Sequence, residues 1–273
     1  MKEIKTIKIL GVPINKISKK QFLQKVKTII SKKQKLQIAT VNAEFLVDAQ
    51  KNKDFHKILN FSFNIADSAS ILWAAFYLKS IKQFPKNLRF LIRILFFLPS
   101  LILTPFSSLF FKEIPTRLPG ADIFWDLIKL ADKKGWRIYL LGAQEGVAQK
   151  TRRVILKRYP RAQIVGAETG DNIETNKLVD KINNTQTNIL FVAYGAPKQE
   201  KWINANMGKL NSGTVAIGVG GTFDFVSGLV ERAPKWMRNL GLEWFFRLMK
   251  NPKKRLPRIL KAIFVFPWLV LAK

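Results

Sequence analysis

A chain of 273 residues with an apolar content of 48% is long enough to bury the core of one large domain, or of a domain with an appendage. Lys and Arg number 47 against 18 Asp and Glu, so the formal net charge is +29, and a balance this basic indicates a polyanionic partner, either nucleic acid or an anionic membrane surface. The absence of cysteine excludes disulfides and cysteine-based metal sites and permits a cytosolic compartment.

The excess of positive charge is concentrated at the two ends of the chain. Residues 1–35 hold eleven lysines and one glutamate, and residues 230–273 hold eleven Lys or Arg and two Glu. The N-terminal lysines fit a solvated surface as well as a binding surface, whereas the C-terminal cations alternate with apolar and aromatic residues. No continuous apolar run opens the chain, so we expect no signal peptide.

Short apolar runs alternate with helix-compatible segments along the chain, which is typical of a mostly parallel α/β sheet. The strands are predicted over Leu36–Val41, Phe61–Ala66, Arg137–Leu141 and Ala162–Gly166, followed by the apolar runs that begin at Ile189 and Thr214. The helices are predicted over Glu44–Leu59, Glu145–Tyr159 and Ile173–Asn183, with a further helix after Pro197. We assign residues 1–238 to this α/β body.

One segment of the body, at about residues 77–115, breaks the alternation. Within it, Ile94–Phe111 contains 18 residues without a charge, long enough to be considered as a membrane span. Pro99 and Pro105 are expected to break a continuous helix, and cations stand on both sides of the run. We therefore expect an apolar hairpin or re-entrant wedge that dips into one leaflet, the alternatives being a buried helical pair and a single span.

Residues 239–273 form a second exceptional segment, rich in both aromatic and basic side chains. Aromatic rings and cations on a short helical tail suit the headgroup boundary of a membrane, so we predict a basic helical C-terminal membrane appendage. A helix docked on the body is the alternative, and the two descriptions are compatible.

Two glycine-rich junctions in the last third of the chain point to a ligand site. The apolar run from Ile189 stops at Gly195, and the run from Thr214 stops at Gly218. Parallel strands that end in this way would face the same edge of a sheet, where open α/β folds bind ligands. Gly218 to Phe223 lacks the third glycine of a dinucleotide fingerprint, and no Gly-x-x-x-x-Gly-Lys phosphate loop is present.

Polar residues at the ends of the earlier strands could carry chemistry. Asp67 follows one strand, and Thr40 and Asn42 end the strand before it, so that a carboxylate able to act as a general base would lie beside groups that orient a sugar or phosphate. A lone Asp in this position could instead cap a helix. The single histidine, His56, is expected on the surface.

Cations and helix starts complete the set of candidates. Arg117, just before a predicted helix, would suit a diphosphate clamp or a surface salt bridge, and Asp122 could be only a helix cap. Gln199 and Glu200 begin the helix after Pro197 and would point back to the same rim. The sequence has no Asp-x-Asp motif and no histidine cluster, so diphosphate binding would depend on Arg, Lys and backbone N–H groups.

Taken together and in order, these residues resemble the WecG/TagA/CpsF family of bacterial glycosyltransferases over most of residues 5 to 260. The matching positions are Thr40 to Asn42, Ala66-Asp67, Arg117 to Gly120, Leu140 to Gly142, Gly195 to Glu200, Gly218 to Phe225, Gly228, Arg232 to Trp236, Gly241 to Trp244 and Arg247. No single motif is specific, but the ordered set is.

The resemblance implies an inverting, metal-independent enzyme that moves an N-acetylmannosamine-type sugar from UDP to the GlcNAc of a polyprenyl-diphosphate-linked acceptor, in cell-surface polysaccharide or teichoic acid synthesis. It implies a Rossmann-like fold with flanking helices, no cofactor, and a place on the cytoplasmic face of the bacterial plasma membrane, peripheral or monotopic. The expected partners are the UDP-sugar, the lipid-linked acceptor and an anionic membrane surface, not nucleic acid; homo-oligomerisation stays open.

On the same resemblance, Asp67 is the general base that removes the proton of the acceptor hydroxyl. Thr40 and Asn42 line the pocket, and Gln199 contacts the sugar or nucleotide. The diphosphate would be held by Arg117 and by one or more of Arg247, Arg255 and Arg258. The remaining expected substrate-binding positions are Gly142, Gly195, Glu200, Gly220 and Asp224.

The chain departs from the family pattern in places. Ser68 stands where relatives usually have Gly, and the segment at 77–115 is longer and more apolar than usual. A catalytically inactive, membrane-associated scaffold that binds nucleotide sugars is the alternative function. A nucleic-acid-binding protein is suggested by charge alone, because no recognised nucleic-acid module is present.

Overall fold

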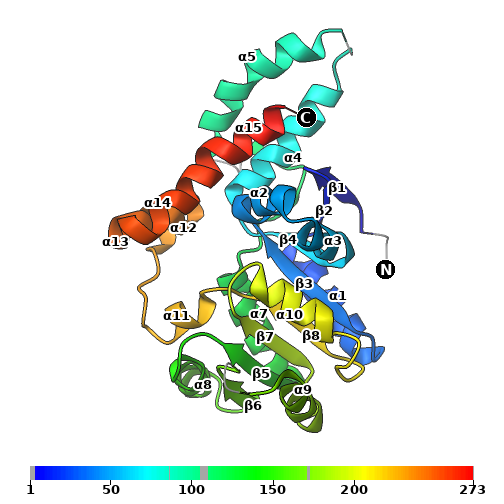
Figure 1. The fold of residues 1–273 in the computed structure, drawn as a ribbon, viewed down its shortest axis with the longest axis vertical. Helices are drawn as coiled ribbons and strands as arrows, with labels where there is room; N and C mark the ends of the chain where they lie inside the picture. Colours follow the sequence, from blue (N-terminus) through cyan, green and yellow to red (C-terminus); the bar gives the residue numbers. More distant parts are fainter. Residues whose placement is uncertain (1–3, 86, 105–109, 171–172, 273) are drawn as a thin grey trace. The chain divides into compact units, whose positions relative to one another are not determined.

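The computed structural model describes residues 4–85, 87–104, 110–170 and 173–272, and so leaves out Pro105 and part of the uncharged run (Figure 1). The chain forms two compact units. The first comprises Met1–Ser18, Val41–Leu118 and Arg232–Lys273, and the second comprises Lys19–Thr40 and Pro119–Glu231. Each unit is therefore assembled from segments that are far apart in the sequence.

The second unit contains five of the six strands of the main sheet, β3 (Leu36–Val41), β5 (Arg137–Gly142), β6 (Gln163–Glu168), β7 (Ile189–Ala193) and β8 (Val215–Gly218). Their order is β3-β8-β7-β5-β6, and all four neighbouring pairs are parallel. Every residue of β7 and β8 is buried, as in strands covered on both faces. The predicted mostly parallel, Rossmann-like α/β sheet is confirmed.

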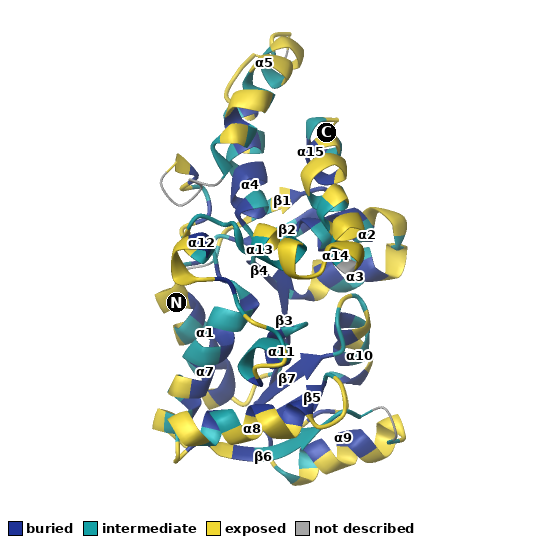
Figure 2. Cartoon of the chain, turned by 90° about the vertical axis from the view of Figure 1, so that its left-hand side faces the viewer, coloured by how far each residue is buried: buried dark blue, intermediate teal, exposed yellow. Residues whose placement is uncertain are grey.

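Helices cover both faces of these strands. They are α1 (Lys19–Ser31), α7 (Gly120–Lys134), α8 (Val147–Arg158), α9 (Thr175–Asn184), α10 (Lys198–Asn206) and the short α11 (Thr222–Val226). In Figure 2, α1 and α7 lie on one side of the strands, and α9 and α10 on the other. Side chains alternate accordingly: Leu190 and Val192 join the cluster under α9 and α10, whereas the Phe191 ring lies 4.7 Å from that of Phe124 on α7.

The first unit begins with an antiparallel hairpin, β1 (Thr6–Ile9) and β2 (Val12–Asn15), which the sequence analysis did not predict. It continues with α2 (Ala43–Lys51), α3 (Lys53–Phe61) and β4 (Phe63–Ala66). The predicted helix over Glu44–Leu59 is thus two helices. Asn52 separates them, because its side-chain oxygen accepts a 3.0 Å hydrogen bond from the N–H of Phe55 and so caps α3.

The predicted strand Phe61–Ala66 begins two residues later than expected. α3 runs through Phe61, and both the N–H and the hydroxyl of Ser62 donate to the carbonyl of Ile58, which closes the helix before β4 starts.

The apolar segment folds as a helical hairpin of α4 (Ala69–Lys82) and α5 (Arg89–Ile102). The two helices are antiparallel: the Trp73 indole donates to the Ser100 hydroxyl (3.0 Å), and the Tyr77 hydroxyl to the carbonyl of Arg93 (2.9 Å). Pro99 lies inside α5, so the prediction that it breaks the helix is wrong. Pro99 lacks the N–H for one internal hydrogen bond, but the helix continues for three residues beyond it, to Ile102.

The C-terminal segment consists of α12 (Lys235–Asn239), α13 (Glu243–Lys250), α14 (Pro252–Leu260), a π-helical turn (Lys261–Val265) and α15 (Phe266–Leu271). It is docked within the first unit: Phe266 is fully buried, with its ring 6.2 Å from that of Trp73. The salt bridges Arg258–Glu44 and Lys261–Asp48 connect it to α2. Among the described residues, no helix has both the length and the apolar character that a membrane crossing requires.

Candidate functional site

The second unit brings the two glycine junctions together, as the sequence predicted. β7 and β8 are parallel neighbours, with Val192 opposite Gly218, so their carboxyl ends lie at the same edge. The side-chain oxygen Oε1 of Gln199 accepts a hydrogen bond from the N–H of Gly195 (3.2 Å) and another from the N–H of Gly220 (2.9 Å). One amide at the start of α10 therefore connects both loops.

Glycine is required in these loops for two reasons. Gly195 and Gly220 have positive φ angles of 76° and 51°, a region that side chains disfavour, and this turns their N–H groups toward Gln199. At Gly218 the constraint is space: a Cβ there would lie 2.5 Å from Nε2 of Gln199 and 2.6 Å from Oε1 of Glu200. The sequence alone did not reveal this second constraint.

Glu200 is a fully buried carboxyl group beneath this arrangement. Its Oε1 accepts a 2.7 Å hydrogen bond from Nε2 of Gln199, which leaves the Gln199 oxygen directed at the loops. Burial raises the pKa of Glu200 to about 7, and the hydrogen bond from Gln199 only partly opposes this. Its second oxygen is buried without a hydrogen-bond partner among the described residues. Glu200 thus supports the rim from below rather than pointing out to it.

The other candidates of the second unit have mainly backbone partners. Thr40, at the end of β3, is buried and donates through its hydroxyl to the carbonyl of Gly218 (3.1 Å). Gly142 ends β5 so close to β7 that a Cβ would lie 2.8 Å from the carbonyl carbon of Ala193. Asp224 is half-buried in the first turn of α11, and its backbone carbonyl accepts from Val230.

In the first unit, Asp67 directly follows β4 and is half-buried. Its N–H donates to the carbonyl of Val41 (2.9 Å). The helix after it is preceded by Ser68 as the N-cap residue, so the alternative that Asp67 is a helix cap is wrong. Ala66 accepts a 2.7 Å hydrogen bond from the N–H of Leu118, which places the Arg117 segment alongside the end of β4.

Asn42 has a structural partner in this unit. Its side-chain oxygen accepts from the N–H of Phe45 (3.1 Å) and caps α2. Asp122, in contrast, is not the cap of α7, because that position belongs to Pro119.

Arg117 connects the end of β4 to the C-terminal segment. Its Nη2 donates a 2.6 Å hydrogen bond to the carbonyl of Arg238, and a Cβ on Gly241 would lie 3.7 Å from its Nη1. Nη2 of Arg117 therefore binds a backbone carbonyl and not a surface carboxylate, which was the alternative for this residue. One edge of the guanidinium is thus anchored to a backbone carbonyl in the last turn of α12.

Arg247, in the C-terminal segment, lies in an electrostatic environment that includes Asp67. Burial lowers the pKa of Arg247, and Arg258 lowers it further, whereas the carboxylates of Glu243, Asp67 and Glu44 raise it. Arg258 also pairs with Glu44, with Nε 2.6 Å from Oε2. Arg255 is half-buried on α14 between these positions. The sequence analysis named neither Glu44 nor Glu243 as a site residue. Glu243 lies four residues before Arg247 on α13, a spacing that could have indicated the pair, whereas no local spacing links Glu44 to α13 or α14.

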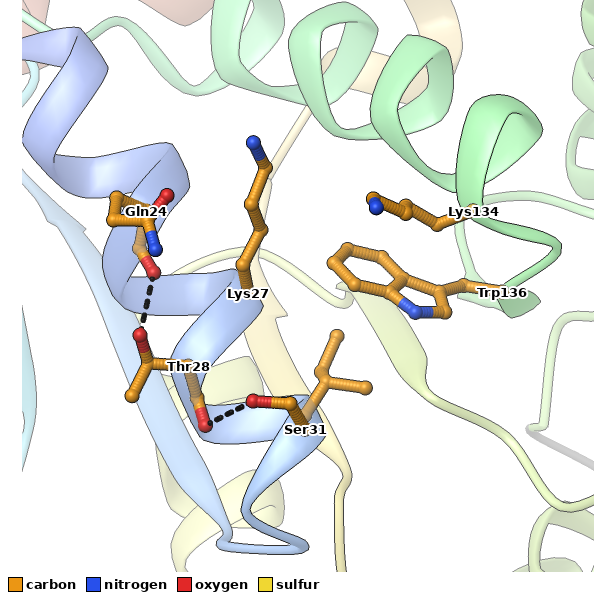
Figure 3. A pocket seen from close by; sticks show the side chains of 7 residues that line it. Gln24, Lys27, Thr28, Ser31, Lys134 and Trp136 are labelled. Carbon is orange, nitrogen blue, oxygen red and sulfur yellow. Dashed lines mark hydrogen bonds between the residues drawn. The ribbon is translucent and has the colours of Figure 1, made fainter.

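A pocket of about 250 Å³ lies elsewhere in the second unit, between α1 and the start of β5 (Figure 3). The Thr28 and Ser31 hydroxyls in its wall donate to carbonyls of their own helix, those of Gln24 and Thr28. None of the candidate residues lines it. It is therefore not the site that the motifs predicted. Within the described residues, no three His, Asp or Glu side chains are grouped so as to hold a metal ion.

The chain is similar to known proteins along nearly its whole length. The model described as the glycosyl transferase WecG/TagA/CpsF family matches residues 7–91 and 95–273. The chain is 32% identical over 216 residues to the N-acetylglucosaminyldiphosphoundecaprenol N-acetyl-beta-D-mannosaminyltransferase of Bacillus subtilis (strain 168), covering 79% of this chain and 72% of the relative. A protein of the same name from Staphylococcus aureus (strain MW2) is 26% identical over 263 residues, 95% of this chain and 90% of the relative.

Proposed function

This chain belongs to the WecG/TagA/CpsF family of glycosyl transferases and is a hexosyltransferase; we propose that it transfers an N-acetylmannosamine-type sugar from UDP to a polyprenyl-diphosphate-linked GlcNAc. The name of the two relatives describes transfer of N-acetylmannosamine to that acceptor. The observation that carries the proposal is the match over nearly the whole chain, which includes Asp67, Arg117, Gln199 and Arg247. The polymer served would be a cell-surface polysaccharide or a teichoic acid.

We assign donor binding to the rim of the second unit. Gln199 holds the loops at Gly195 and Gly220 in one arrangement, and such loops after parallel strands are where open α/β folds bind nucleotides. Thr40 stabilises the same region through the carbonyl of Gly218. A prearranged loop pair lowers the entropy cost of binding the donor.

We assign proton transfer to Asp67 and charge stabilisation to the arginines. The acceptor hydroxyl oxygen attacks the anomeric carbon while Asp67 accepts its proton, and the bond from that carbon to the diphosphate oxygen breaks, so that UDP leaves with the bonding electrons. A single displacement of this kind inverts the configuration. Arg117, Arg247, Arg255 and Arg258 supply positive charge for the diphosphate groups, a role for which guanidinium is suited, and this makes the proposed reaction metal-independent.

A lipid-linked acceptor requires the enzyme to work at a membrane surface. We propose peripheral association with the cytoplasmic face of the bacterial plasma membrane, supported by the cations and exposed aromatics of the C-terminal segment, among them Trp244, Phe264 and Trp268.

A donor screen tests the proposed function. The purified chain is given UDP-N-acetylmannosamine, its uronate and other UDP-hexoses with a short-chain polyprenyl-diphosphate-GlcNAc, with and without EDTA. We expect transfer of one N-acetylmannosamine-type sugar, with inverted configuration and unaffected by EDTA. Tight binding of a donor without turnover on any acceptor would instead support the inactive scaffold.

A further inference from the structure

The α4–α5 hairpin leaves one long apolar face of α5 uncovered (Figure 2). Phe90 is 75% exposed and Ile102 73%, with a continuous row between them. The members of this face are Phe90, Leu91, Ile94, Leu95, Leu98 and Ile102, whose spacing of three to four residues places them on one side of a helix. We call these six residues the α5 face.

The opposite side of α5 packs against α4, with Ser100 buried and Phe96 and Phe97 half-buried, so the exposure does not come from a helix without contacts. The Phe96 ring lies 6.2 Å from Tyr77, and the Phe97 ring 5.9 Å from Trp73. The hydrogen bond from Trp73 to Ser100 lies between the same two helices. α15 also packs against α4 and α5, with Phe266 buried beside Trp73. The hairpin therefore exposes the α5 face while the other side of α5 is packed against α4 and α15.

The charged residues of the segment that carries the α5 face all have one sign. Residues 68–112 contain six Lys or Arg and no Asp or Glu. Lys79 and Lys82, in the last turn of α4, line a hollow of about 420 Å³ together with Lys8 and Lys16. The buried carboxylate of Glu113 pairs with Lys79 and Lys16. Burial and the charge of Lys79 lower the pKa of Lys16, as expected where cations are crowded.

We propose that the α5 face is a lipid-inserting surface whose partner is a bilayer containing anionic lipids. Its apolar side chains enter the acyl region, while the lysines of the hollow and Arg93 meet phosphates at the level of the headgroups. This inference rests on the proposed function in one respect, because a lipid-linked acceptor brings the enzyme to a membrane. The observations behind it do not involve the catalytic residues.

The length of α5 and the charge around it favour a bilayer surface over a membrane crossing, a second copy of the chain or a protein partner. At 1.5 Å per residue, the 14 residues of α5 extend about 21 Å, less than the roughly 30 Å of a hydrocarbon core, so the helix lies in the interface rather than crossing it. A second copy would bring the same excess of cations face to face, because Glu113 pairs with Lys79 and Lys16 but the other Lys and Arg of residues 68–112 have no Asp or Glu within that segment. Protein–protein interfaces usually have a polar rim around an apolar centre. A rim that contains both charge signs is missing from residues 68–112, which have no Asp or Glu.

The absence of native cysteine makes a direct test straightforward. A single cysteine, Leu95→Cys, is labelled on the full chain with a polarity-sensitive fluorophore, and Phe61→Cys serves as the matched control, because Phe61 is 77% exposed on α3, away from the α5 face. Vesicles of phosphatidylcholine alone and with about one third phosphatidylglycerol are added without donor or acceptor. We expect a blue shift and quenching by acyl-chain nitroxides at position 95 with anionic vesicles, and neither at position 61.

A second set of variants measures binding. Leu91→Gln, Leu95→Gln and Leu98→Gln combined should weaken co-sedimentation with anionic vesicles at least tenfold, whereas Phe61→Gln should leave it unchanged, and thermal unfolding should show both chains folded. Unchanged sedimentation of the folded triple variant, or a label at position 95 that stays in water on vesicle-bound protein, overturns the inference. A label already shielded without vesicles, in a larger species on gel filtration, would identify a second copy instead.

The outcomes also separate this inference from the proposed function. Insertion of position 95 without sugar transfer from any donor would leave the inference standing and remove the function. Transfer to a water-soluble acceptor by a chain that fails to insert would do the reverse.

Discussion

The side-chain amide of Gln199 donates a 2.7 Å hydrogen bond to the carboxyl group of Glu200, its immediate neighbour in the chain. Both side chains are buried, at 1% and 0% exposure. This contact determines which end of the amide faces the two glycine loops, and so links a buried titratable group to the proposed donor site.

Glu200→Gln should remove a pH dependence of stability. Because burial raises the pKa from 4.5 to about 7, the folded state binds the proton more tightly than the unfolded state. The contribution to stability is complete below pH 4.5, and it is lost as the pH rises toward 7, by up to about 3 kcal/mol at 1.36 kcal/mol per unit. Urea unfolding of both proteins across this range measures the difference. If the free energy of unfolding changed with pH in the same way in both proteins, the raised pKa of Glu200 would be contradicted.

Gln199→Leu keeps the approximate size of the side chain but removes the acceptor shared by Gly195 and Gly220. With two loop N–H groups released, we expect UDP to bind at least tenfold more weakly, and the free energy of unfolding to fall by about 1–3 kcal/mol. Calorimetric titration with UDP measures the first effect. Gln24→Leu, on an exposed position of α1, is the matched control, and equal affinity in the two variants would argue against the role of Gln199.

Asp67→Asn should abolish sugar transfer while the chain still folds and binds UDP, because an amide cannot accept the acceptor's proton. A general base contributes roughly 10²–10⁴-fold, so the initial rate should fall by at least this range. Asp54→Asn, an exposed carboxylate at the start of α3, is expected to retain the rate. Near-normal turnover of the Asp67 variant would remove Asp67 from the mechanism.

Gly218→Ala should destabilise the second unit, because the new Cβ would lie 2.5 Å from Gln199 and 2.6 Å from Glu200. Overpacking of this kind costs about 1–3 kcal/mol. Gly208→Ala is the control, since nothing lies within 4 Å of a Cβ there. Thermal unfolding compares the two, and a smaller loss at position 218 than at 208 would show that the neighbours move aside freely.

Arg258→Ala tests the proposed part of the C-terminal arginines in acceptor binding. The pair with Glu44 is half-exposed and contributes little to folding, so stability should barely change. The KM for the diphosphate-linked acceptor should rise about tenfold, with the KM for the UDP-sugar unaffected. Lys253→Ala, at an exposed position of the same helix, is the comparison. An equal effect of both changes would mean that only general surface charge matters.

Local pattern was sufficient where an element is defined by its own residues. The run at Ile189 predicts a strand because both of its faces are covered, and it therefore contains uninterrupted apolar residues. The run at Leu36 is mostly apolar, with Gln37 and Thr40 as its polar positions. The hairpin of β1 and β2 was not predicted, because four-residue strands carry too little periodicity. Asn52 divided a predicted helix through one side-chain hydrogen bond, which apolar spacing does not register.

For the candidate site, too, some features follow from local sequence and others only from the folded structure. By itself, the sequence determined the mostly parallel sheet and the adjacent glycine junctions, because strands and the turns that end them are specified by short-range order. It also predicted Asp67, Arg117 and Gln199 as site residues. Only the tertiary structure decided that Glu200 is buried against Gln199 and that Arg247 lies in the electrostatic field of Asp67. These relationships join distant segments or depend on what covers a side chain, and burial and electrostatic coupling arise only when the chain is folded.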